Sequence, residues 1–66
     1  MPNYRADLYA AGPLWQRTER YDASNPVEAV ETARQKVAAH DSEYALVYAA
    51  DGNGHTTYIA KVGAER

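Results

Sequence analysis

The sequence predicts an α+β fold in which a four-stranded antiparallel-type sheet carries one helix on one face, in the order ββαββ. Two observations lead to this prediction. Only one segment has helical signals, and on each side of it two strand-like segments are separated by a turn signal, Gly12-Pro13 in the first half and residues 51–54 in the second. With 66 residues the chain is long enough for one domain, and a sheet covered by one helix is the simplest way to pack these elements.

Residues 3–11 and 14–22 are predicted to form the first hairpin. In the first segment Tyr4, Ala6 and Leu8 alternate with more polar residues, which is the period of a half-buried strand. The second segment is polar on both faces. We therefore expect it at an edge of the sheet, where charged side chains discourage unwanted pairing.

The helix is predicted over residues 26–40, and its start is marked by three signals. The side chain of Asn25 can cap the first turn, Pro26 suits the first helical position, and Glu28 lies in capping-box position. These signals agree on where the helix begins.

The predicted apolar stripe of this helix is narrow and made of small residues, with Val30, Ala33 and Val37 on one face. A helix of this length is not stable alone in water. We therefore expect it to dock closely on the sheet.

Residues 44–51 and 55–63 are predicted to form the second hairpin, with Ala45, Val47 and Ala49 facing the helix. Two registers remain open. A turn centred on Gly52-Asn53 places Leu46 opposite Ile59, whereas an Asn53-Gly54 turn places Tyr48 opposite Ile59 and Val47 opposite Ala60. Residues 63–66 are expected to form a frayed tail.

One helix covers only one face of a sheet, so the other face is predicted to be the interaction surface. Its expected residues are Tyr44, Leu46, Tyr48, Ile59 and Trp15. Tyr and Trp are favoured where a surface is half buried and half wet. Three interpretations stay open: the tyrosines cap the rim of a small core, the chain self-associates through this face or through an edge strand, or another partner binds there.

The residue types argue against several chemistries. The chain has no cysteine and two histidines, so neither a disulfide nor a thiolate zinc site is predicted. Residues 51–62 do not fit a calcium loop, because Thr56 and Val62 stand where Gly and Glu are needed. His40-Asp41 is compatible with a general-base pair, but a helix C-terminus explains it better. No catalytic, metal or cofactor residue is predicted, and we expect a protein that is not an enzyme.

A single-stranded nucleic-acid binder is the second hypothesis, because exposed aromatic rings on a sheet can stack bases. The net charge of −2 argues against it. The candidate rings and phosphate contacts are Tyr9, Trp15, Tyr44 and Tyr48, with Arg5, Arg17, Arg20 and Lys61.

The first hypothesis is a small non-enzymatic protein-interaction module, a regulator, adaptor or inhibitor, which forms a homodimer or binds another protein. A third is a subunit of a larger enzyme or assembly. No signal peptide and no membrane span is predicted, so we expect a cytoplasmic protein without a membrane partner. The small size and alanine-rich composition are typical of a bacterial or mobile-element protein.

Overall fold

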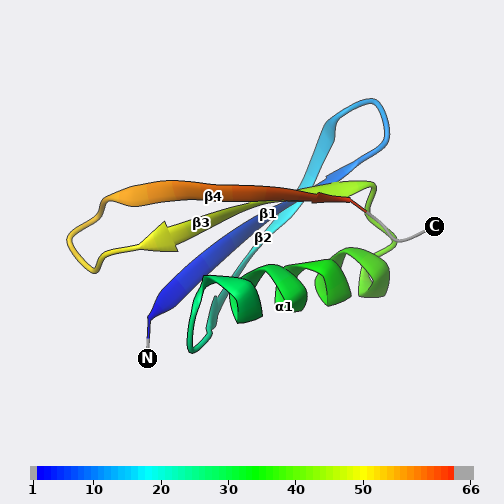
Figure 1. Ribbon diagram of the computed structural model, residues 1–66. Helices are drawn as coiled ribbons and strands as arrows, with labels where there is room; N and C mark the ends of the chain where they lie inside the picture. The colour runs from blue at the N-terminus through cyan, green and yellow to red at the C-terminus, as the bar shows by residue number, and fades with distance from the viewer. Residues whose placement is uncertain (1, 64–66) are drawn as a thin grey trace.

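Four strands and one helix form two layers in a computed structural model of the chain, which describes residues 2–63 (Figure 1). This confirms the predicted α+β class and the ββαββ order. Of the expected tail, Gly63 instead ends the last strand, and residues 64–66 lie outside the described residues. The elements are β1 (Asn3–Ala10), β2 (Leu14–Asp22), α1 (Pro26–Ala39), β3 (Tyr44–Ala50) and β4 (Thr56–Gly63).

The sheet is antiparallel throughout, with the strand order β2-β1-β3-β4. The first strand of each hairpin is therefore central, and β1 pairs with β3 across the middle of the sheet. The polar β2 lies at an edge, as its composition predicts. The second edge is β4.

The helix starts as the sequence predicts. Asn25 Oδ1 accepts a 2.8 Å hydrogen bond from the backbone N–H of Glu28, and Pro26 occupies the first turn. The carboxylate of Glu28 reaches back to the backbone N–H of Ser24, one residue earlier than in a standard capping box. The first bond pairs an amide group that the first helical turn leaves without a partner, and the second ties the residue before the N-cap to the helix.

The helix ends in a Schellman motif. The backbone N–H of Asp41 donates to the carbonyl of Ala38 at 3.3 Å, and that of Ser42 donates to the carbonyl of Val37 at 2.9 Å. Asp41 adopts a φ of 54°, the left-handed conformation that glycine usually supplies at this position. The chain thereby turns back toward β3.

The core lies between the helix and one face of the sheet. Ala29, Ala33 and Val37 are the buried residues of α1, and the largest fully buried side chains of the protein are Leu8, Val37 and Val47. Of the ten buried apolar residues in the described part of the chain, five are alanine. The core is therefore thin, because these small side chains bury little apolar area.

A β-bulge interrupts each hairpin. In β2, Leu8 pairs with Arg17 and Tyr9 pairs with Trp15, so Gln16 is an extra residue. Gln16 accepts a hydrogen bond from the buried Ser42 hydroxyl, in the loop that follows α1. The bulge thus ties the edge strand to the end of the helix.

The second bulge lies in β4, where Val47 pairs with Ala60 and Tyr48 pairs with Tyr58. Ile59 is the extra residue. The pairing on the Val47 side follows the predicted Asn53-Gly54 register, and the bulge then shifts it, so neither predicted register runs through the whole hairpin.

Within residues 2–63, no helix has the length and apolar composition needed to cross a membrane.

Candidate functional site

The face of the sheet opposite α1 carries most of the aromatic side chains, and we call it the open face. Its members follow from strand alternation and from the pairing across the four strands. They are Asn3, Arg5, Asp7 and Tyr9 of β1, Trp15, Thr18, Arg20 and Asp22 of β2, Tyr44, Leu46, Tyr48 and Ala50 of β3, and Thr56, Tyr58 and Lys61 of β4.

Three aromatic residues form a row at one end of the open face. Trp15, Tyr9 and Tyr44 are consecutive partners across β2, β1 and β3. The rings of Tyr9 and Tyr44 stack with centroids 5.0 Å apart and planes 7° apart. The Trp15 side chain, with 60% of the residue exposed, extends this row toward the sheet edge. The row is a preformed apolar platform.

A second row crosses the middle of the open face. The guanidinium carbon of Arg5 lies 4.4 Å from the ring centroid of Tyr48, and the Tyr48 and Tyr58 rings meet edge to face at 5.8 Å. Lys61 Nζ lies 4.6 Å from the ring centroid of Tyr44. Each cation therefore packs on an aromatic ring, and this fixes its position on the face.

Polar contacts link the two rows. The Trp15 indole N–H donates to the Thr18 hydroxyl at 3.3 Å, and that hydroxyl donates to Asp7 Oδ1 at 2.9 Å. Asp7 also forms an ion pair with Arg5, whose Nε lies 3.3 Å from Oδ1. Arg5 and Asp7 are thus paired with each other, and Leu46, between Asp7 and Lys61 in the register, is the aliphatic side chain there.

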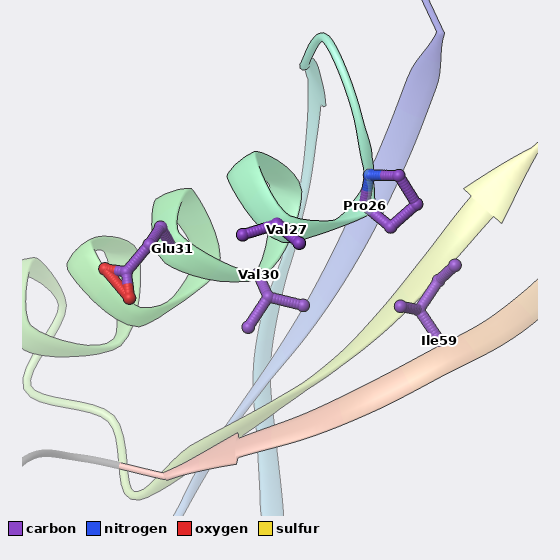
Figure 2. A pocket seen from close by; sticks show the side chains of 5 residues that line it. All are labelled: Pro26, Val27, Val30, Glu31 and Ile59. Carbon is purple, nitrogen blue, oxygen red and sulfur yellow. The ribbon is translucent and has the colours of Figure 1, made fainter.

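The predicted placement of Ile59 on this face is wrong. Ile59 packs against the core and lines a hollow of about 280 Å³ together with Pro26, Val27, Val30 and Glu31 of the helix (Figure 2). The bulge is the physical reason, because one extra residue places Ile59 on the same side of β4 as Ala60. The remaining predicted surface residues, Tyr44, Leu46, Tyr48 and Trp15, share the open face.

The bulge in β2 has the opposite effect. Simple alternation groups Trp15 with Arg17, Glu19 and Tyr21, but the extra residue moves Trp15 to the open face beside Tyr9. Arg17 stays on the helix side, where its Nη1 lies 3.5 Å from His40 Nδ1 and its Nε lies 2.9 Å from Glu19. The prediction that Arg17 could contact phosphates beside the aromatic rings is therefore wrong.

Sequence reasoning missed Tyr58 as a member of this surface, although it is 55% exposed and contacts Tyr48. It also missed the pairing of Asp7 with Arg5. Strand alternation could have found Asp7, whereas Tyr58 could be placed only once the β4 bulge was known.

His40 and Asp41 serve the helix end. His40 is the C-cap of α1 and Asp41 forms the left-handed turn after it. Among residues 2–63, no group of three or more His, Cys, Asp or Glu side chains comes together to hold a metal ion. The open face presents aromatic rings, cations and carboxylates that accept from neighbouring side chains.

Comparison of the chain with protein families, with curated proteins and with solved structures finds no match.

Proposed function

We propose that this protein is a small non-enzymatic protein-interaction module that self-associates through the open face. The observation that carries the proposal is the continuous aromatic and aliphatic surface formed by Trp15, Tyr9, Tyr44 and Leu46 on the face that the helix does not cover. Monomeric proteins rarely expose large contiguous apolar patches, and such patches mark interaction sites.

A second copy of the chain is the occupant that fits best. A two-fold dimer needs a self-complementary surface, and the open face carries both signs of charge, Arg5, Arg20 and Lys61 with Asp7 and Asp22. A standard interface buries about 800 Å² of each partner, roughly a fifth of this chain's 4198 Å² surface. One face of the sheet can supply that area.

The thin core is a second reason to propose self-association. The alanine-rich contact between α1 and the sheet leaves a small chain with little buried apolar area. Packing two open faces together would place the two sheets about 10 Å apart and bury the rings of both copies between them, as in a sandwich of two sheets. Oligomerisation is a common means by which so small a chain gains stability.

The test compares Leu46→Asp with Val27→Asp by sedimentation equilibrium. Leu46 lies on the open face, whereas Val27 is 76% exposed on the helix side, so the two variants introduce the same charge on different surfaces. We expect Leu46→Asp to weaken dimerisation at least about tenfold, because a carboxylate beside Asp7 would be taken out of water in the interface and Lys61, its cross-strand neighbour, offsets only part of that cost. Val27→Asp should leave the dimer unchanged.

Trp15 supplies an independent readout, because it is the single tryptophan of the chain and lies in the proposed interface. Its emission should shift to the red on dilution of the native chain and should already be red-shifted in Leu46→Asp. Circular dichroism at 222 nm should be the same for both variants. A native chain that remains monomeric at high micromolar concentration, or equal loss of association in both variants, contradicts the proposal.

A further inference from the structure

A polar hollow lies on the open face at the end away from the Trp15 row. Its volume is about 330 Å³, and its lining includes Arg5, Arg20, Asn3, Thr56, His55 and Ala50, with the glycines of the β3–β4 turn. Ala50 lies between Asn3 and Thr56 in the register, and its methyl side chain leaves space between these larger neighbours. The larger neighbours and the turn form the walls.

The two arginines of the hollow are directly opposite each other in the β1–β2 pair. Like charges at opposed positions destabilise a sheet. Asp7 compensates Arg5 in part, but the Arg20 guanidinium has no ion-pair or hydrogen-bond partner within residues 2–63. The hollow therefore contains positive charge that the described part of the chain does not neutralise.

Arg5 is held in place by Tyr48 and Asp7. Its guanidinium stacks on Tyr48 at 4.4 Å and directs two of its five N–H donors toward Asp7. Its Nε is buried without a well-formed hydrogen bond. The remaining donors are on a group that stacking has already oriented, so little side-chain entropy is lost when an anion binds.

Among residues 2–63 no acidic side chain lines the hollow, and the two carboxylates nearest to it in the sheet and turn already accept hydrogen bonds from residues of its rim. Asp22 accepts from Asn3 at 3.1 Å. Asp51 Oδ1 accepts hydrogen bonds from the backbone N–H groups of Asn53 at 2.8 Å and His55 at 3.2 Å. Asp51 Oδ2 lies 3.4 Å from His55 Nδ1. The side chains that face the hollow thus present mainly donors.

We propose that this hollow binds the terminal phosphate of a small phosphate monoester. Two guanidinium groups, the Thr56 hydroxyl and the His55 ring can donate to the three oxygens of a dianion, and Arg matches phosphate geometry with paired donors. The volume is at the lower end for small-molecule sites and exceeds what one phosphate group needs, so a small organic part fits beside it.

The test is a titration of the isotope-labelled chain with phenyl phosphate, with inorganic phosphate, acetate and a single-stranded oligothymidylate as the other arms. Phenyl phosphate should shift the amide resonances of residues 52–56 in a saturable way. Arg20→Gln should weaken this binding at least about tenfold, because the charge-assisted bonds to Arg20 are lost, and Arg20→Lys should weaken it less. Arg34→Gln removes the same charge from the helix and should change the affinity less than about twofold.

Thr56→Val gives a second variant that keeps every charge and should also weaken binding. Because the hollow and the proposed dimer interface share the open face, the titration is also performed on Leu46→Asp, in which self-association is weakened and the hollow should still bind phenyl phosphate. Equal losses in Arg20→Gln and Arg34→Gln, acetate binding as tight as phenyl phosphate, or affinity that rises with oligothymidylate length would each overturn the proposal. The last result would instead identify a site for single-stranded nucleic acid.

Discussion

Tyr21 joins the edge strand β2 to the helix through one hydroxyl group. Its Oη donates a 2.7 Å hydrogen bond to the carbonyl of Ala29, and its ring stacks on Tyr4 with centroids 6.1 Å apart. Burial raises the pKa of Tyr21 to about 12, and the nearby Tyr4 contributes to that rise. The neutral hydroxyl is therefore part of the packed structure.

Tyr21→Phe should lower the free energy of unfolding by about 1 kcal/mol, because the hydrogen bond is lost and the carbonyl of Ala29 keeps no partner from that side chain. Urea denaturation at pH 7 measures this. Tyr58→Phe is the control, since Tyr58 is 55% exposed and should change stability little. A loss as large in Tyr58→Phe would contradict the assigned role of the Tyr21 hydroxyl.

Tyr21 should also make the stability of the fold depend on pH in the alkaline range. The unfolded chain releases the Tyr21 proton near its usual pKa of 10, whereas the folded chain releases it near 12, so this group lowers stability as pH rises through that interval. The stability of Tyr21→Phe should therefore fall less steeply between pH 10 and 12 than that of the native chain.

At the scale of elements, the end of α1 contains a residue in a conformation that its type disfavours. Asp41 has a φ of 54°, and only glycine reaches this region without steric cost. Asp41→Gly should raise the free energy of unfolding by roughly 0.5 kcal/mol, since the relief of strain exceeds the added entropy of the unfolded chain. Asp41→Ala should instead destabilise, because alanine lacks the local hydrogen bonds that ease this conformation for aspartate.

Thermal unfolding of the two variants measures both effects: the midpoint should rise in Asp41→Gly and fall in Asp41→Ala. If glycine and alanine at position 41 shift the midpoint in the same direction, the left-handed turn after His40 is not what limits stability there.

The elements themselves could be predicted because their signals are local. Asn25, Pro26 and Glu28 mark the helix start within four residues, and the turn residues mark both hairpins. The polar character of β2 also predicted its edge position correctly, because burial on either face would require apolar residues there.

The composition of the open face could be predicted only in part. The alternation of β3 places Tyr44, Leu46 and Tyr48 together, since no residue interrupts it. The faces on which Trp15 and Ile59 lie depend on the two bulges. The extra residues at the bulges, Gln16 and Ile59, are not of a type that indicates a bulge in the sequence. A bulge adds one residue to a strand whose side chains alternate with a period of two, so alternation alone misplaces the residues on one side of it.

At the scale of the whole molecule, ion pairs connect the layers and make stability depend on pH. The hydrogen bond from Lys36 on the helix, with the nearby charge of Arg17, lowers the pKa of Glu19 on β2. Backbone hydrogen bonds from Asn53 and His55 lower that of Asp51. A carboxylate whose pKa is lower in the folded chain than in the unfolded chain stabilises the fold at pH values above its unfolded pKa.

Stability should therefore be constant from pH 7 to about 5 and should decrease as pH falls through 4.5, the usual pKa of Glu, toward the lowered folded value. Urea midpoints between pH 7 and pH 2 measure this. Glu19→Gln should be less stable than the native chain at pH 7 and should show a weaker decrease in acid. Glu31→Gln, on the exposed face of the helix, is the matched control and should retain the native profile.

Both bulges lie in edge strands, Gln16 in β2 and Ile59 in β4. An unbroken edge is a template on which a further strand from another molecule can add, and repeated addition leads to fibrils. A bulge bends and twists the edge strand and breaks its regular spacing of amide and carbonyl groups. The two irregularities that decide which side chains reach the open face thus also make both edges poor templates for the addition of a further strand.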